Sequence, residues 1–235
     1  MIDILIQIVV AAIPAIVAIT LHEAAHGYAA LALGDDTAKQ QGRLSLNPIR
    51  HIDRVGTILL PGGLILFQLL TVGRVIFLFG WAKPVPVSAW RFRDPRRGMA
   101  LVAAAGPAAN FVLAWLGALA MHGLDLLPEA ISSLAEGMLI SFILANLVLG
   151  LFNLLPIPPL DGGRIAVGIL PLRAAMAWAR LERAGIVIVL LLVFLGPRLL
   201  AEFGIRFDPV GAALHSLLPR AFDLIYWLAG LDAGT

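Results

Sequence analysis

Two histidines separated by three residues lie near the start of the chain, in the sequence His22-Glu23-Ala24-Ala25-His26. On a helix, positions i and i+4 share one face, so both imidazoles can reach a single zinc ion. Zinc polarises a scissile carbonyl and lowers the pKa of an attacking water toward about 7, and Glu23 is placed to accept the proton of that water. The spacing therefore predicts a hydrolytic zinc site, with His22 and His26 as ligands and Glu23 as the general base.

A catalytic zinc needs three protein ligands and one open position, so a third ligand must come from elsewhere. The chain has no cysteine, which leaves His, Asp or Glu. Asp161 is the best candidate because it follows an apolar run broken by prolines at 156, 158 and 159 and precedes two glycines, which allow a close backbone approach. The competing interpretation is that Asp161 only caps the helix that follows it.

The composition predicts that the bilayer is the solvent of these residues. Hydrophobic residues make up 60% of the 235 residues and charged residues only 14%, with a mean hydropathy of +0.93. A net charge of +2, with the basic residues in short loops, argues against nucleic acid as a partner. No polar block is large enough to fold separately, so we expect a single membrane domain over 1–235, with a catalytic core at about 4–165 and accessory segments at about 184–230.

Apolar runs recur along the whole chain and predict an all-α polytopic membrane protein. Two His and a Glu within such a run are costly in lipid, which itself calls for a function. The last run contains charged residues and could instead lie at the membrane interface. The predicted segments are 4–33, 56–80, 99–121, 138–160, 184–203 and, more weakly, 210–230.

The distribution of basic residues predicts the topology. The stretches 39–54, 83–97 and 164–183 hold 13 of the 17 basic residues, whereas 122–137 holds none, so the first three should face the cytoplasm. Residues 56–80 join two of these stretches and must then enter the membrane and return, as a re-entrant segment beside the active site. The expected fold is a bundle of about five transmembrane helices with this re-entrant segment. Both halves of the metal site then reach a similar depth.

These residues resemble the site-2 protease family of intramembrane zinc metalloproteases. The family motifs His-Glu-x-x-His and Asn-x-x-Pro-x-Pro-x-x-Asp-Gly occur in order, at 22–26 and 153–162, and the sequences at 80–86 and 106–110 are similar to its small prokaryotic branch. The resemblance covers roughly residues 15–170. It implies one Zn²⁺ per chain bound by His22, His26 and Asp161, with Glu23 catalytic and water entering from the cytosol. The PDZ or CBS domains of other members have no counterpart here.

Two asparagines are weaker candidates for binding substrate or the transition state. The family match suggests that Asn153 hydrogen-bonds the substrate backbone or a tetrahedral intermediate, although a membrane asparagine more often bridges helices. Asn110 is a similar candidate, but Gly106, four residues earlier, equally indicates close helix packing.

The predicted activity is cleavage of peptide bonds within or near transmembrane segments of other membrane proteins, as in regulated intramembrane proteolysis. The expected location is a prokaryotic cell membrane, with the active site toward the cytoplasm. The expected partners are a transmembrane protein or peptide substrate and the lipid bilayer. The alternatives are a transporter or metal carrier that uses intramembrane His and Asp, and a catalytically silent scaffold.

Overall fold

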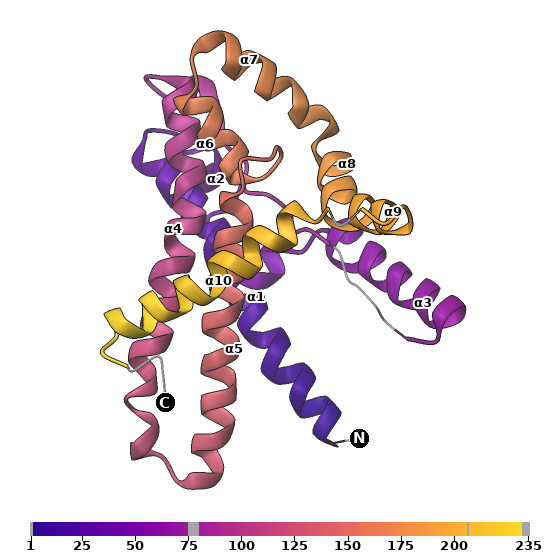
Figure 1. The fold of residues 1–235 in the computed structure, drawn as a ribbon. Helices are drawn as coiled ribbons and strands as arrows, with labels where there is room; N and C mark the ends of the chain where they lie inside the picture. The colour runs from indigo at the N-terminus through magenta and orange to yellow at the C-terminus, as the bar shows by residue number, and fades with distance from the viewer. Residues whose placement is uncertain (1, 75–79, 206, 232–235) are drawn as a thin grey trace.

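The computed structural model describes residues 2–74, 80–205 and 207–231, and these contain helices and loops but no strand (Figure 1). This confirms the predicted all-α class. The helices are α1 (Ile2–Ala32), α2 (Thr37–Gln40), α3 (Leu60–Val72), α4 (Pro95–Met121), α5 (Glu129–Leu154), α6 (Asp161–Ile169), α7 (Leu172–Arg180), α8 (Gly185–Leu190), α9 (Gly196–Glu202) and α10 (Pro209–Leu228).

Five helical stretches in the described part of the chain are long and apolar enough to cross a membrane, as the composition predicts. Arg54–Val72, which belongs to the segment expected to be re-entrant, qualifies by length and hydropathy, whereas α10, for which an interfacial position was also considered, does not. The five stretches are Val9–Ala32, Arg54–Val72, Pro95–Met121, Ile131–Leu154 and Leu172–Glu202. The protein is therefore a multi-pass membrane protein.

The core is formed by α1, α4 and α5, which pack against one another, with α6 packed against α4 (Figure 1). In Figure 1, α4 descends from the upper end of the molecule, α5 returns upward beside it, and α1 runs in the same general direction as α5. Because α6 continues upward from the end of α5, its first residue meets the upper half of α1. The chain thus brings residues 22–26 and 161 together across about 135 positions of sequence.

The ends of the core helices follow from local chemistry. Asp94 caps α4 by accepting hydrogen bonds from the backbone amides of Arg96 and Arg97, and Pro95 occupies the first helical position. Helix α5 ends at Leu154, just before Pro156, which breaks the helix as predicted. It begins at Glu129, nine residues before the predicted start at 138, because the polar residues after Pro128 continue the helix beyond the apolar run.

Glycines 162 and 163 allow the chain to fold back tightly after the prolines. A Cβ on Gly162 would lie 2.2 Å from the carbonyl oxygen of Leu154, and a Cβ on Gly163 would lie 2.7 Å from the nitrogen of Pro158. No other residue type fits such contacts with rigid backbone. The close approach predicted from the two glycines is therefore required to start α6 directly beside the end of α5.

Residues 54–74 lead away from the core, and residues 80 and 81 lie beside it again. A helical turn at Arg54–Leu59 leads into α3, which projects away from the bundle, and residues 75–79 lie outside the described part (Figure 1). The two ends of this excursion are joined, because the backbone amide of Trp81 donates to the carbonyl of Gly56 at 3.1 Å. The re-entrant placement of 56–80 in a bilayer stays a prediction.

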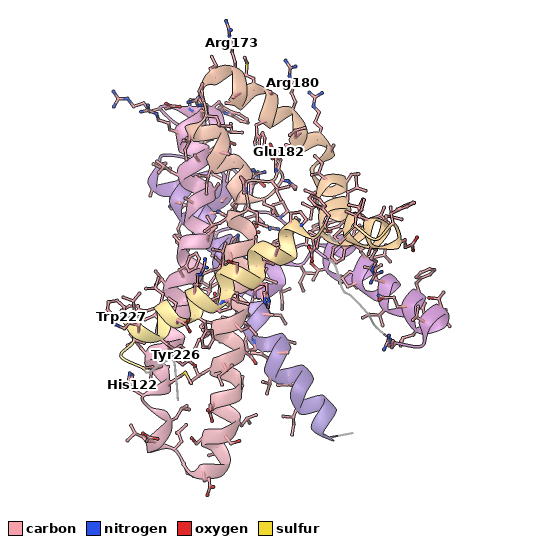
Figure 2. The ribbon with its side chains drawn as sticks, viewed as in Figure 1. His122, Arg173, Arg180, Glu182, Tyr226 and Trp227 are labelled. Atoms are coloured by element: carbon pink, nitrogen blue, oxygen red, sulfur yellow. The ribbon has the colours of Figure 1, made fainter. Side chains whose placement is uncertain are left out.

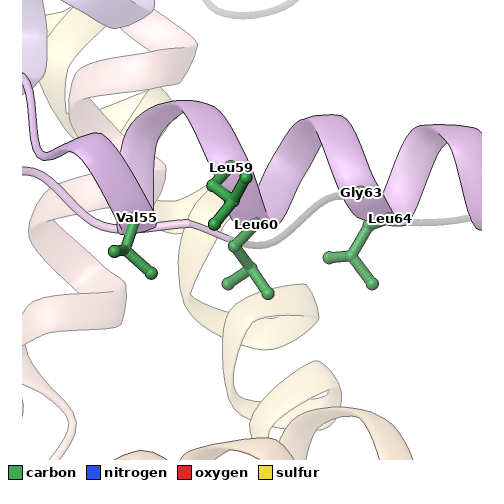
Figure 3. Close-up of a pocket in the computed structure, with 5 residues that line it drawn as sticks. All are labelled: Val55, Leu59, Leu60, Gly63 and Leu64. Carbon is green, nitrogen blue, oxygen red and sulfur yellow. The ribbon is translucent and has the colours of Figure 1, made fainter.

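The surface recess beside this excursion is apolar and contains none of the predicted site residues. It has a volume of about 270 Å³ and is lined by Val55, Leu59, Leu60, Gly63 and Leu64, as Figure 3 shows. The side chains that line this recess are all aliphatic, which is consistent with a lipid-facing surface.

The C-terminal part has two unlike sections. Residues 172–202 form one helical stretch, which contains the predicted segment 184–203 and changes between α-helix (α7, α8 and α9) and short 3-10 and π-helical turns. Helix α10 then crosses the face of α4 and α5 (Figure 1), and its Ile225 and the following Ala229 are buried against them. Nε2 of His122 donates a hydrogen bond of 2.8 Å to the carbonyl oxygen of Ala229, near Tyr226 and Trp227 in Figure 2.

Candidate metal centre

The two predicted histidine ligands lie on one face of α1 with their Nε2 atoms facing each other. These nitrogens are 3.1 Å apart, and the side chain of His22 is 6% exposed against 12% for His26. Because α1 runs unbroken through residues 22–26, the i and i+4 spacing converges as the sequence predicts.

Asp161 brings the third candidate ligand from the first position of α6. Its Oδ2 atom lies 3.1 Å from Nε2 of His22 and 3.4 Å from Nε2 of His26. The carboxylate therefore faces the imidazoles across the helix bundle, which is the arrangement required of a ligand. A residue serving only as a cap for α6 would instead direct its oxygen to the amides of its own first turn.

These three atoms have the spacing that a tetrahedral zinc site requires. Ligand atoms about 2.0 to 2.2 Å from zinc in tetrahedral geometry are about 3.3 to 3.6 Å apart, close to the three distances of 3.1, 3.1 and 3.4 Å. Oδ2 of Asp161 is also buried without a hydrogen-bond partner among the described residues. An orphaned carboxylate oxygen beside two imidazole nitrogens fits a cation, so His22, His26 and Asp161 could hold a metal ion.

The other ring nitrogen of each histidine is held by a hydrogen bond. Nδ1 of His22 lies 2.6 Å from Oδ1 of Asn110, and Nδ1 of His26 lies 2.8 Å from the carbonyl oxygen of Val102. Both acceptors come from α4. A proton on each Nδ1 leaves the Nε2 lone pair free for a metal, which is how outer partners fix the ligand tautomer.

Gly106 of α4 makes room for both rings. A Cβ at this position would lie 2.6 Å from Cε1 of His22 and 2.5 Å from Cε1 of His26. Helix α4 can therefore lie directly against the imidazoles only because residue 106 has no side chain. Sequence reasoning assigned Gly106 to helix packing and did not connect it with the ligands.

Glu23 lies between the two histidines in sequence and points toward an extended segment formed by residues 82–88. Its Oε2 accepts a hydrogen bond of 3.1 Å from the backbone amide of Val85. The two residues before Val85 are held by Arg43, which is 8% exposed. Its guanidinium donates to the carbonyl oxygens of Lys83 and Pro84 at 2.8 and 3.4 Å. The buried guanidinium of Arg43 thus holds the backbone next to Val85, and the amide of Val85 orients the Glu23 carboxylate.

The same segment is tied to the end of α1 by Asp35, a fully buried carboxylate. It accepts hydrogen bonds from the backbone amide of Ser88 at 2.6 Å and from the amide and hydroxyl of Thr37, and it lies 3.7 Å from Nε of Arg91. Burial alone would raise the pKa of Asp35, but these hydrogen bonds and the arginine charge lower it below its ordinary value. Asp35 therefore stays ionised and anchors the segment that contacts Glu23.

The two candidate asparagines have different surroundings. Asn110 is fully buried behind His22, whereas the side-chain amide of Asn153 donates to the Leu149 carbonyl of its own helix at 3.0 Å. The structure brings Asn110 into the site and gives Asn153 no described contact with the metal-site residues. A role for either in binding substrate stays a prediction.

Sequence reasoning missed Asn146, which is fully buried and bonded to Asn110. The only available signal was a polar side chain in an apolar run, and that signal does not say what the side chain contacts.

The model of peptidase family M50, the site-2 protease family, matches residues 127–196, which include the proline-rich turn and Asp161. "Putative zinc metalloprotease YwhC" of Bacillus subtilis is 45% identical over 184 residues, which cover 75% of this chain and 76% of that protein. The chain belongs to peptidase family M50.

Two mycobacterial proteins support this membership of family M50. "Putative zinc metalloprotease Rip2" of Mycobacterium tuberculosis is 30% identical over 220 residues, covering 92% of this chain and 71% of that protein. "Putative zinc metalloprotease Rip3" from the same species is 40% identical over 135 residues, which are 56% of this chain and 30% of that protein. No solved structure matches. As an M50 peptidase, the protein is a membrane zinc metalloprotease, and Zn²⁺ is the metal that the cluster would hold.

Proposed function

We propose that this metalloprotease hydrolyses peptide bonds within or near the transmembrane segments of other membrane proteins, from the cytoplasmic side of the cell membrane. The observation that supports this proposal is the position of the metal cluster along α4, well inside the ends of that helix. The histidines contact α4 at Val102 and Gly106, which are 7 and 11 residues after its start at Pro95. At about 1.5 Å per residue, the site lies about 10 to 17 Å inside the end of this helix, within a hydrocarbon layer about 30 Å thick.

The orientation is proposed from the basic residues at the same end of the bundle. Arg96 and Arg97 begin α4, and Arg173 and Arg180 project outward from α7 at the top of Figure 2. The loop after α4, at residues 122–128, has no basic side chain apart from the histidine at its start. By the positive-inside rule, the basic end faces the cytoplasm, so the cluster lies in the cytoplasmic half of the membrane.

The proposed chemistry divides the work among the residues of the site. His22, His26 and Asp161 would hold zinc, which when bound supplies Lewis-acid chemistry, polarising a carbonyl and making water a better nucleophile at neutral pH. Glu23 accepts one proton of the attacking water as the new C–O bond forms. It then delivers this proton to the amide nitrogen as the C–N bond breaks, which releases an amine and a carboxylic acid. The hydrogen bond from Val85 keeps the Glu23 carboxylate in place for both transfers.

The substrate must present its carbonyl in an unwound form. A transmembrane helix has every backbone carbonyl hydrogen-bonded, so one that enters this site has to lose part of its helical structure first. We infer that helix-weakening residues such as Gly or Pro near the cleaved bond favour hydrolysis.

The test compares the zinc-loaded protein with Glu23→Gln in liposomes that contain a single-span model protein labelled at both ends. The unmodified enzyme should cut this protein within or next to its span, as located by mass spectrometry. Glu23→Gln should retain zinc but lose cleavage by at least about 100-fold, consistent with the loss of a general base. The exposed Glu202→Gln on α9 is the matched control and should cleave normally.

Two outcomes would contradict the proposal. Cleavage of an added soluble protein, with the membrane substrate left intact, would place the enzyme among ordinary peptidases. Zinc flux across the liposome membrane that Glu23→Gln abolishes, in the absence of any cleavage, would support the metal-carrier alternative.

A further inference from the structure

Three buried hydrogen-bonding groups form a chain that leads from the metal site into the middle of the bundle. Nδ1 of His22 on α1 contacts Oδ1 of Asn110 on α4 at 2.6 Å, and Nδ2 of Asn110 donates to Oδ1 of Asn146 on α5 at 2.8 Å. Nδ2 of Asn146 in turn donates to the backbone carbonyl of Phe142 at 2.9 Å. Both asparagines are 0% exposed, so water cannot replace any of these partners.

The direction of every hydrogen bond in this chain is fixed from one end. A backbone carbonyl can only accept, so the Phe142 oxygen requires the amide nitrogen of Asn146 and turns its oxygen toward Asn110. That oxygen requires the amide nitrogen of Asn110, whose own oxygen then faces His22. An oxygen facing Nδ1 requires a proton there, which leaves Nε2 of His22 as the lone pair on the metal side.

We propose that Asn146 is a positioning residue for the metal ligand His22, and that it acts through Asn110. This inference rests on the proposed function, because it takes His22 as a zinc ligand. Without Asn146, the amide of Asn110 could turn by about 180° and present its NH₂ group to His22. The remaining contact that opposes this rotation is the carbonyl of Ala18, at 3.5 Å from Nδ2 of Asn110, which is longer than an ordinary hydrogen bond.

The tautomer of His26 is fixed without a chain of side-chain amides. Its Nδ1 contacts the carbonyl oxygen of Val102 directly, and a carbonyl cannot reverse its polarity. Substitution of the side chains around the two histidines should therefore disturb the tautomer of His22 more readily than that of His26. This asymmetry separates a positioning role for Asn146 from a general contribution to helix packing, which would affect both ligands equally.

The first experiment measures zinc affinity by chelator competition in the purified full-length protein. We expect Asn110→Ala to lower the affinity by about 10 to 100-fold and Asn146→Ala by about tenfold, as is typical when an outer partner of a metal ligand is removed. The double variant should be no weaker than Asn110→Ala, because Asn146 acts only through Asn110. Additive losses in the double variant would overturn the proposal.

Asn153→Ala is the matched control for this affinity measurement. Asn153 lies on the same helix and makes the same hydrogen bond to the carbonyl four residues earlier, but it has no described link to Asn110. It should leave zinc affinity unchanged. If Asn146→Ala behaves like Asn153→Ala, Asn146 has no positioning role.

A second experiment needs no substitution in the chain of amides, so a variant that fails to fold cannot obscure the answer. In the zinc-loaded protein, the Nδ1 proton of His22 should give a ¹⁵N-coupled NMR signal that exchanges slowly with water, assigned by its loss in His22→Gln. Exchange as fast as that of an exposed imidazole would overturn the proposal. Failure of the unmodified protein to bind zinc would reject the proposed function itself, whereas normal zinc binding with no effect of Asn146→Ala would reject only this inference.

Discussion

The bundle of α1, α4, α5 and α6 differs from the peripheral segments α3 and α7 to α9 in what it buries. The core spans on α1, α4 and α5 bury 28%, 33% and 22% of their residues, whereas the spans at Arg54–Val72 and Leu172–Glu202 each bury 11%. The side chains buried in the core include imidazoles, amides and a carboxylate, while the periphery exposes aliphatic side chains such as Leu70 and Val187. In lipid, burying apolar side chains gives little driving force, so polar networks and close small-residue packing specify the core.

The largest effect is expected from removing the ligand that α6 contributes to the core. Asp161→Ala should lower zinc affinity more than 100-fold, beyond the about 10 to 100-fold typical of outer partners, and should abolish cleavage. The matched peripheral variant is Glu202→Ala on α9, which should bind zinc normally. Equal zinc affinity in the Asp161 variant and the unmodified protein would show that the third ligand lies elsewhere.

A pair of glycine substitutions compares the packing of the two regions directly. Gly106→Ala introduces a Cβ about 2.5 Å from the imidazoles and should destabilise the protein by about 3 kcal/mol, at the upper end for overpacking. Gly63→Ala on α3 meets no atom within 4 Å and should stabilise its helix by about 0.5 to 1 kcal/mol. Thermal unfolding in detergent measures both. Equal effects would mean that the core is no more tightly packed than the periphery.

The buried carboxylate of Asp35 predicts that the stability of the fold depends on pH. Asp35→Asn should cost about 2 kcal/mol at neutral pH, within the usual range for hydrogen bonds to a charged group. A carboxyl with a lowered pKa stabilises the fold above its unfolded value of about 3.9, and this contribution disappears as the pH falls through the folded value. The difference in melting temperature between variant and unmodified protein should therefore shrink between pH 5 and pH 2. A constant difference would contradict an ionised Asp35.

The smallest effect is expected where the two regions are joined at the surface. Arg164 of α6 and Glu182 form an ion pair at 2.8 Å, with both side chains more than 40% exposed. Glu182→Gln should change stability by no more than about 0.5 kcal/mol, and less at high salt, because water screens exposed pairs. A larger loss in urea or heat denaturation would mean that α7 and the following turn are more firmly attached to the core than their burial indicates.

The sequence predicted the parts of the site that depend on local spacing. The i and i+4 histidines converge because α1 is continuous, and Asp161 follows a break that prolines impose in any environment. Gly106 and Asn146 could not be assigned because their roles depend on which helix lies beside them, and hydropathy gives no information about helix neighbours. The π-helical turn at Leu191–Leu195 could not be predicted either, since its residues are uniformly apolar and carry no signal for a local change of helix type.

The glycine at position 106 also has a stereochemical consequence. With no side chain there, the backbone of α4 lies flat against both imidazoles and closes that flank of the metal cluster to any incoming molecule. A polypeptide can then approach only along the flanks that α4 leaves open. Access from one side restricts which of the two faces of the planar peptide amide meets the attacking water. The enzyme should therefore discriminate between a peptide made of L-amino acids and its mirror image made of D-amino acids.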